Sequence, residues 1–294
     1  MKLIDLYRDI RSELVKINSC DEEAAAEAEF ILLSKRFSSY TGDTLTRESL
    51  FGVKEQCEIS EKGVTSARDI IKRRIEGIPL QYILNEAWFY GLNFQVYSSK
   101  THKTFIPRPE TEIIVEESLK FIKSCKASKI NALDIGTGSG CIPITIIKNS
   151  NRKILWDAID PFLTTIPHEN AKNHILEDLI RFSKVELSKY HRNENKKYNL
   201  ITANLPYVPN NSNIDSVVKH EPLEAIFGGE DGLDHIRETV KLIPKILQRS
   251  DSIAIFEIDP SQLTFFNALE EIYSIEIIQD INMLDRIVLL KFKN

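Results

Sequence analysis

The strongest constraint on the fold is an apolar run that passes directly into a glycine-rich turn, LDIGTGSG at residues 133–140. Pro143 follows in what the pattern predicts to be the first turn of a helix. Glycines at such a turn let the backbone approach a ligand closely, and the helix N-terminus offers unpaired N–H groups to an anion. The sequence therefore predicts a strand–turn–helix unit that binds a ligand.

Strands and helices alternate on both sides of this turn. Strand-like segments recur at 130–135, 154–159, 198–203 and 253–258, with helical or loop segments between them. Such alternation is typical of an α/β fold with a doubly wound, mostly parallel sheet. Two further segments, 275–278 and 286–292, lie close together in the sequence and predict an antiparallel pair.

The N-terminal part of the chain has a different pattern. Apolar residues recur at helical spacing from Leu3 to Ile17, and Ser19 with Glu22 predicts a capping box for a second helix that runs to Phe37. Further helices are expected at about 46–57 and 65–76, followed by an aromatic hairpin that is broken at Gly91. We expect three parts: a helical domain (1–85), a β-hairpin linker (86–104) and the α/β domain (105–294).

Composition argues against several classes of protein. Of 294 residues, 42% are hydrophobic and 28% are charged, and the formal net charge of −5 gives no overall attraction to nucleic acid. The four cysteines have no zinc-site spacing, so we expect a reduced, cytoplasmic protein without a structural metal. No apolar run approaches the roughly 18 residues of a membrane span, and no signal peptide is expected.

The spacing of the glycines discriminates between ligands. Gly136, Gly138 and Gly140 form GxGxG, whereas the dinucleotide fingerprint GxGxxG requires a third glycine where Cys141 stands. The next strand ends at Asp160, and an acid at that point accepts hydrogen bonds from ribose hydroxyls. This combination favours an adenosine ligand without a pyrophosphate, such as S-adenosylmethionine. A tight turn followed by a surface aspartate is the alternative.

A second unusual feature is a strand that ends on an amide, in the sequence Asn204-Leu205-Pro206-Tyr207. Parallel strands end at one rim of a sheet, so we expect Asn204 to lie near the glycine turn. The Asn204 side-chain oxygen and the Leu205 carbonyl are neighbouring acceptors that Pro206 holds still, and they match the two donors of a substrate NH2 group. With Tyr207 against the amide plane, the nitrogen would be oriented for attack on a methyl group. A plain strand-to-loop turn is the alternative.

On these residues the chain resembles the peptide chain release factor glutamine methyltransferases. The shared segments are GIPLQYI (77–83), FYGL (89–92), IPRPETE (106–112), DIGTGSG (134–140), NLPY (204–207), EP (221–222) and GGEDGL (228–233). The resemblance implies methylation of N5 of the glutamine in the GGQ motif of class I release factors, which converts S-adenosylmethionine to S-adenosylhomocysteine without a metal. It also implies a seven-stranded Rossmann-like sheet, an N-terminal substrate-recognition domain, and a cytoplasmic monomer with neither a membrane nor a stable nucleic-acid partner.

The resemblance further implies a role for each matching residue. Binding of S-adenosylmethionine is implied for Asp134, Gly136, Thr137, Gly138, Gly140, Asp160, Glu186 and Asn204. Substrate binding is implied for Arg108, Pro109, Glu112, Asn204, Leu205, Pro206, Tyr207 and Glu221, and catalysis for the four residues 204–207.

The chain departs from the family pattern at three points. The family usually reads Asn-Pro-Pro-Tyr, so Leu205 removes one conformational lock on the carbonyl. Glu186 stands where the family usually has aspartate, and no glycine follows Glu257. Three alternatives stay open: an adenine-N6 methyltransferase, a ribosomal-protein glutamine methyltransferase, and a non-catalytic protein-binding module with the same fold.

Overall fold

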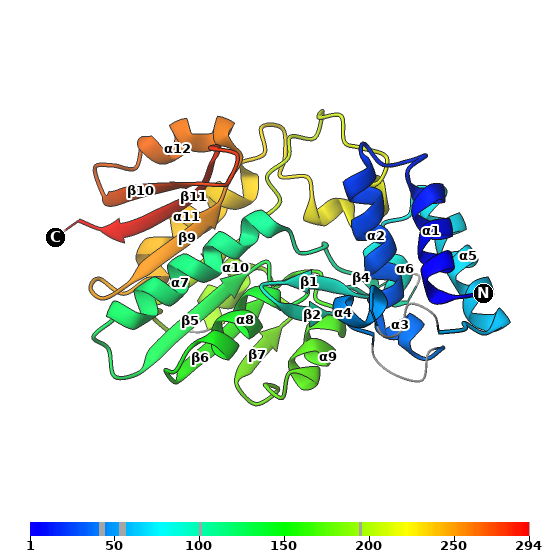
Figure 1. Cartoon of the computed structure of the whole chain (residues 1–294). Helices are drawn as coiled ribbons and strands as arrows, with labels where there is room; N and C mark the ends of the chain where they lie inside the picture. Colours follow the sequence, from blue (N-terminus) through cyan, green and yellow to red (C-terminus); the bar gives the residue numbers. More distant parts are fainter. Residues whose placement is uncertain (41–44, 53–56, 100–101, 194–195, 294) are drawn as a thin grey trace. The chain divides into compact units, whose positions relative to one another are not determined.

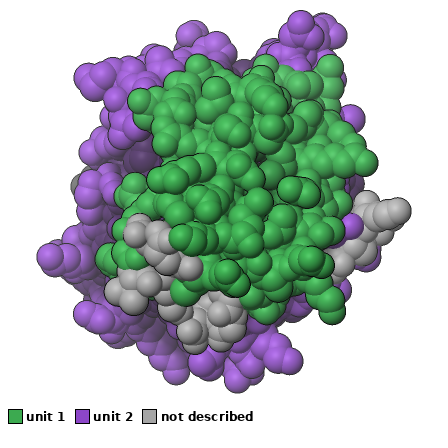
Figure 2. All heavy atoms as spheres, turned by 45° about the vertical axis from the view of Figure 1, so that its right-hand side comes forward, with its two compact units in different colours: residues 1–86, 215–220 green, residues 87–214, 221–294 purple. Residues whose placement is uncertain are grey.

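The computed structural model describes residues 1–40, 45–52, 57–99, 102–193 and 196–293. The chain forms two compact units, coloured separately in Figure 2. Unit 1 comprises Met1–Glu86 and Asp215–His220, and unit 2 comprises Ala87–Ile214 and Glu221–Asn294. The short segment 215–220 thus belongs with residues far away in the sequence, and no local sequence pattern indicates this.

Unit 1 is a helical bundle around one apolar core, to which the stripe Leu3, Leu6, Ile10 and Leu14 contributes. Its helices are α1 (Leu3–Leu14), α2 (Asp21–Leu33), α3 (Lys35–Ser38), α4 (Arg47–Leu50), α5 (Glu61–Ile75) and α6 (Leu80–Leu84). Segment 215–220 adds a short 3-10 helix, Val218–His220.

The ends of these helices differ from the expected ones for local reasons. The predicted capping box is wrong, because the hydroxyl of Ser19 donates to Glu23 at 2.6 Å and α2 begins after Cys20. The second helix stops at Leu33, since Ser34 caps the next helix by accepting from the Phe37 N–H. The helix expected at 46–57 ends at Leu50, and its residues 53–56 lie outside the described part of the chain.

Unit 2 contains the predicted doubly wound sheet, with seven strands in the order β10-β11-β9-β8-β5-β6-β7 (Figure 1). The parallel strands are β5 (Ile130–Ile135), β6 (Ile154–Ile159), β7 (Ile180–Ser183), β8 (Leu200–Ala203) and β9 (Ile253–Glu257). The strands β10 (Tyr273–Gln279) and β11 (Asp285–Phe292) form the predicted antiparallel pair. Sequence analysis did not predict β7, whose four residues alternate too briefly to be recognised.

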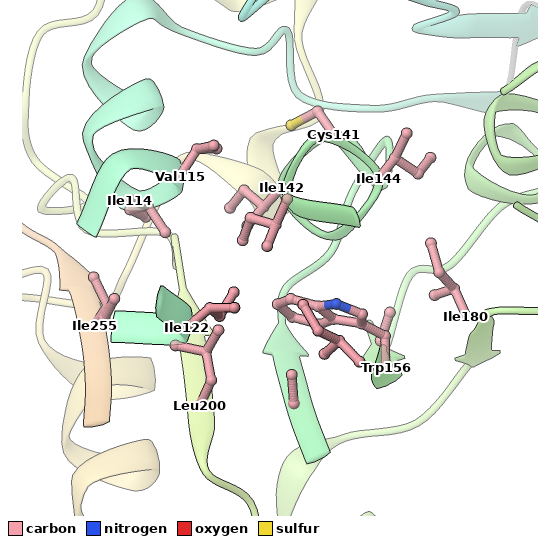
Figure 3. Close-up of a cluster of buried hydrophobic side chains, with 14 of the residues drawn as sticks. Ile114, Val115, Ile122, Cys141, Ile142, Ile144, Trp156, Ile180, Leu200 and Ile255 are labelled. Atoms are coloured by element: carbon pink, nitrogen blue, oxygen red, sulfur yellow. The ribbon is translucent and has the colours of Figure 1, made fainter. Parts of the chain in front are cut away.

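Both faces of the sheet are covered by helices because alternate strand residues point to opposite sides. One core contains Ala132 of β5 together with residues of α7 (Glu112–Ser124), α8 (Cys141–Asn149) and α9 (Ile166–Asn173). The other contains Leu133 of β5 together with residues of α10 (Leu187–Asn193), α11 (Asp234–Ile246) and α12 (Leu263–Asn267). Figure 3 shows side chains of α7 and α8 converging with Trp156 and Leu200 in the first core.

Two small hairpins precede α7 in unit 2. They are formed by β1 (Ala87–Phe89) with β2 (Leu92–Phe94), and by β3 (Tyr97–Ser99) with β4 (His102–Lys103). The first contains the break expected at Gly91, which has a φ of +73°. Across the described ranges, no helix has the length and apolar character that a bilayer span requires.

Candidate functional site

The glycine turn lies between β5 and α8 and is bonded to the end of β6. The N–H groups of Gly136 and Thr137 donate to the Ile159 carbonyl at 2.9 and 3.2 Å. The Gly138 N–H donates to Asp160 Oδ2 at 3.1 Å, and the Phe162 N–H donates to Oδ1 at 2.7 Å. Burial raises the pKa of Asp160, and these two N–H bonds oppose the shift. The structure therefore brings the glycine turn and the candidate ribose acid together.

Beside the turn lies a buried carboxylate that is only half satisfied. The Thr202 hydroxyl donates to Asp134 Oδ1 at 2.6 Å. Among the described residues, Asp134 Oδ2 and Thr137 Oγ1 have no partner in hydrogen-bond geometry, although the Thr137 hydroxyl is near enough to lower the pKa of Asp134. Burial raises the pKa of Asp134 to about 7. A buried acceptor without a donor is unfavourable, so the site suits a ligand that brings its own N–H groups.

Space at the turn also suits a ligand. A Cβ added at Gly138 would meet no atom within 4 Å, so the backbone there borders free space. Gly140 differs, because a Cβ on it would approach Pro167, Ile144 and Phe182, and its role is to let α8 pack. The Asp134 carboxylate, the Asp160 carboxylate and the free space at Gly138 fit the ammonium and ribose of S-adenosylmethionine.

Glu186 lies just after β7 at the same rim. The neighbouring Val185 donates its N–H to the Asp160 carbonyl at 3.2 Å, which holds this stretch of chain against the end of β6. The Glu186 carboxylate itself is exposed and pairs with Lys189 at 3.0 Å. Among the described residues, its carboxylate makes no hydrogen bond to the glycine turn, so its position at the rim is what makes it a candidate.

Asn204 follows β8 and lies directly beside the glycine turn. The pairing of Ala203 with Ile135 brings the two strand ends together. A Cβ at Gly136 would lie 3.2 Å from both the Asn204 carbonyl oxygen and a methyl of Leu205, which explains a glycine at that position. Leu205 is 7% exposed, so its side chain anchors the loop in the core.

The loop 204–209 is fixed by a second segment, 226–232. The Val208 N–H donates to the Ile226 carbonyl at 3.0 Å, and the Gly228 N–H donates to the Val208 carbonyl at 2.9 Å. Side chains at Gly228 and Gly232 would overlap the carbonyl oxygens of Pro206 and Tyr207, respectively. Backbone pairing and close packing thus hold the loop, and they supply rigidity at the point where Leu205 replaces the second proline.

The Asn204 side chain ends a chain of hydrogen bonds. Its Nδ2 donates to Thr111 Oγ1 at 2.9 Å, the Thr111 hydroxyl lies 2.7 Å from Glu257 Oε2, and the Tyr207 hydroxyl donates to Glu257 Oε1 at 3.2 Å. Thr111 and Glu257 are each 2% exposed. Within the described part of the chain, neither Asn204 Oδ1 nor the Leu205 carbonyl accepts a hydrogen bond. Two neighbouring acceptors are therefore available at the rim.

The remaining candidates lie in and around the linker to α7. Glu112 Oε1 accepts from the Tyr90 N–H at 2.6 Å, which joins α7 to the first hairpin. Buried Glu221 accepts from the Ile106 N–H at 3.0 Å and pairs with Arg108. Pro109 begins the 3-10 turn Pro109–Thr111. Both carboxylates accept hydrogen bonds from backbone N–H groups in this structure, and their part in substrate binding stays a prediction.

Sequence analysis missed Thr111 and Glu257 as site residues. Thr111 stands inside the IPRPETE block, but of that block only Arg108, Pro109 and Glu112 were predicted to be site residues. Glu257 is the last residue of a buried strand, and a buried acid at a strand end was a usable signal. Among the described residues, no cluster of three or more His, Cys, Asp or Glu side chains is arranged to hold a metal ion.

Comparison with known proteins gives consistent relatives. The chain is 34% identical over 240 residues to the release factor glutamine methyltransferase of Bacillus anthracis, and the match covers 79% of this chain and 82% of the relative. The Bacillus cereus protein of the same name is 35% identical with the same coverage. No protein-family model matches the chain.

Among solved structures, the catalytic domain of hMettl16 in complex with a MAT2A 3'UTR hairpin has the same type of fold. It is 14% identical, with a TM-score of 0.50, and the match covers 81% of this chain and 85% of that one. At this identity the likeness concerns the fold alone.

Proposed function

The chain belongs to the release factor glutamine methyltransferase family, and from this premise we propose that it methylates the side-chain amide nitrogen of a release factor glutamine. The substrate residue is the glutamine of the GGQ motif in class I release factors. The observation that carries the proposal is a pair of acceptors beside the glycine turn, Asn204 Oδ1 and the Leu205 carbonyl, to which none of the described residues donates a hydrogen bond.

The two acceptors match the two N–H donors of a primary amide. An amide nitrogen is a poor nucleophile because its lone pair is delocalised into the carbonyl group. Asn204 and Leu205 hold both N–H bonds, and Tyr207 lies alongside, so the nitrogen is fixed in one orientation before transfer. Neither acceptor is a base, so the proton that the methylated amide loses passes to solvent. Burial raises the pKa of Tyr207, and its phenol stays neutral.

The cofactor that fits this site is S-adenosylmethionine, which supplies an electrophilic methyl group and becomes S-adenosylhomocysteine. Asp134 would accept from its ammonium group, and Asp160 would accept from its ribose hydroxyls. Gly138 borders free space for the ligand, and Gly136 lets Asn204 and Leu205 lie close to the turn. Thr137 adds a buried hydroxyl without a partner in the described residues. Glu186 is the candidate acid for the adenine edge.

We expect the affinity for S-adenosylmethionine to depend on the ionisation of Asp134. Burial raises the pKa of this acid to about 7, and the ligand ammonium favours its charged form. Affinity therefore falls as pH decreases, by about five- to tenfold between pH 7.5 and 6, a range in which the ligand amine is mostly protonated. Isothermal titration calorimetry at several pH values measures this.

Asp134→Asn provides the control for this pH dependence. The variant should bind more weakly at pH 7.5 and show a nearly constant Kd over the same range, because the group that titrates is gone. An equally steep pH dependence in Asp134→Asn would assign the titration to another group.

The release factor is the proposed protein substrate, and unit 1 is the proposed recognition domain. Arg108 and Pro109 would shape the wall beside the site, with Glu112 and Glu221 fixing the backbone on which they stand. We propose that the protein acts in the cytoplasm as a monomer, where translation terminates, without a metal and without a stable nucleic-acid partner.

A panel of methyl acceptors tests the function against its alternatives. The protein is incubated with methyl-labelled S-adenosylmethionine and, separately, with a class I release factor, a mixture of ribosomal proteins, and an adenine-rich oligonucleotide. We expect label on the release factor alone. Label on the oligonucleotide or on ribosomal protein would replace the proposed substrate, and no label with bound cofactor would favour a non-catalytic binding module.

A further inference from the structure

Thr111 stands between the substrate-facing amide and a buried carboxylate. Its Oγ1 lies 2.9 Å from Asn204 Nδ2 and 2.7 Å from Glu257 Oε2. A threonine hydroxyl has one proton to donate, and its oxygen also accepts. A carboxylate only accepts, so an ionised Glu257 must receive the hydroxyl proton, and the Thr111 oxygen is left as an acceptor.

We propose that Thr111 and Glu257 are positioning residues that keep the Asn204 amide turned with its oxygen toward the substrate. Because the Thr111 oxygen only accepts, Asn204 must face it with Nδ2, and Oδ1 then points the other way. This inference rests on the proposed function, in which Asn204 Oδ1 accepts from the glutamine amide. Neither residue contacts the substrate in this scheme. Glu257 orients the Thr111 hydroxyl, and Thr111 in turn orients the Asn204 amide.

Both carboxylate oxygens of Glu257 act as acceptors, Oε2 for the Thr111 hydroxyl at 2.7 Å and Oε1 for the Tyr207 hydroxyl at 3.2 Å. Burial raises the pKa of Glu257, and Glu110 adds to the shift, while these two hydrogen bonds and the nearby Arg286 cation reduce it. Arg286 is itself held by Asp280 at 3.2 Å and by the Ile258 carbonyl at 3.3 Å. The Tyr207 hydroxyl occupies Oε1, which leaves Oε2 for Thr111.

The orientation of Asn204 decides whether the target NH2 group is held in the geometry for methyl transfer. Oxygen and nitrogen of a side-chain amide have nearly the same shape, so packing alone does not select between the two orientations. In the turned orientation, Nδ2 would face the substrate NH2 group, and two donors would oppose each other. The hydrogen bonds through Thr111 select one of the two orientations of the Asn204 amide before the substrate binds.

Thr111→Val tests the inference because it removes the hydroxyl and keeps the shape. We expect kcat for methylation of a class I release factor to fall about 10- to 100-fold, as for the loss of one buried hydrogen bond. The KM for the release factor and the Kd for S-adenosylmethionine should stay within about twofold, because neither is set by the amide orientation. Thr111→Ser, which restores the hydroxyl, should regain most of the lost kcat.

Thr145→Val is the matched control. Thr145 is 0% exposed on α8, and its hydroxyl has no hydrogen-bond partner in the described residues. The kcat of the Thr145→Val enzyme should therefore equal that of the wild type. A Thr111→Val enzyme with wild-type kcat would overturn the inference. Equal impairment of Thr111→Val and Thr111→Ser would also overturn it, since packing alone would then explain the loss.

A double variant tests whether Glu257 acts through Thr111. Glu257→Gln should reduce kcat by a larger factor in the wild type than in the Thr111→Val background. In that background the hydrogen bonds from Glu257 through Thr111 to Asn204 are already absent. Equal, multiplicative effects in both backgrounds would contradict a shared path. A wild-type enzyme that leaves the release factor unmethylated would instead refute the proposed function, so the two failures are distinguishable.

Discussion

Asn204→Ala should lower kcat for release factor methylation by at least about a hundredfold, the effect of removing one preorganised hydrogen-bonding group from an active site. The amide oxygen is one of the two acceptors proposed to hold the substrate NH2 group, and alanine leaves that position without a partner. The Kd for S-adenosylmethionine should stay within about twofold, because the glycine turn and Asp160 are held by bonds of their own. Steady-state kinetics and calorimetry measure the two quantities.

Asn211→Ala is the control for this prediction. Asn211 is an exposed amide a few residues along the same chain segment, and its loss should leave kcat unchanged. Normal methylation by Asn204→Ala would show that this side chain does not hold the amide. A matching loss of cofactor affinity would assign Asn204 to cofactor binding instead.

Gly232→Ala should damage both the fold and the site. The added Cβ would overlap the Tyr207 carbonyl, a backbone atom that cannot move without displacing the 204–209 loop. Steric overlap together with strain at the positive φ of +76° is expected to reduce the free energy of unfolding by about 2–4 kcal/mol. Because a 1 Å displacement of a substrate-holding group lowers rates steeply, kcat should fall by about a hundredfold.

Gly91→Ala separates steric overlap from backbone strain. Gly91 has a similar φ of +73°, yet a Cβ there would meet no atom within 4 Å. The Gly91→Ala substitution should reduce the free energy of unfolding by about 1–2 kcal/mol through backbone strain alone and leave kcat nearly unchanged. Thermal denaturation and kinetics of both variants provide the comparison, and similar losses from the two would show that segment 226–232 does not hold the loop.

The sheet and the two ends of the site were predictable because their signals are local. The glycine turn follows its own strand, and Asn204 interrupts an apolar run, so each is visible within ten residues or so of sequence. The short strand β7 was missed because four residues carry little periodicity. The end of α2 was wrong because the Ser34 cap of the following helix competed with helix continuation.

The connections within the site were not predictable from local pattern. Thr111 is 93 residues from Asn204 and 146 residues from Glu257, so only the folded sheet brings them together. The GGEDGL block was recognised from resemblance, and the structure supplies its physical reason, which is clearance for the carbonyls of Pro206 and Tyr207. Sequence analysis also expected a less rigid loop at Leu205 and did not foresee its pairing with 226–229.

The central claim is transfer of a methyl group to one glutamine side chain, and tandem mass spectrometry of the methylated release factor tests it most directly. The protein, S-adenosylmethionine and a class I release factor are incubated together, and the peptide that contains the GGQ motif is fragmented. We predict a mass increase of one methylene group on the glutamine side chain, absent from a release factor in which that glutamine is alanine. An unmodified GGQ peptide, or a methyl group on another residue, would contradict the account.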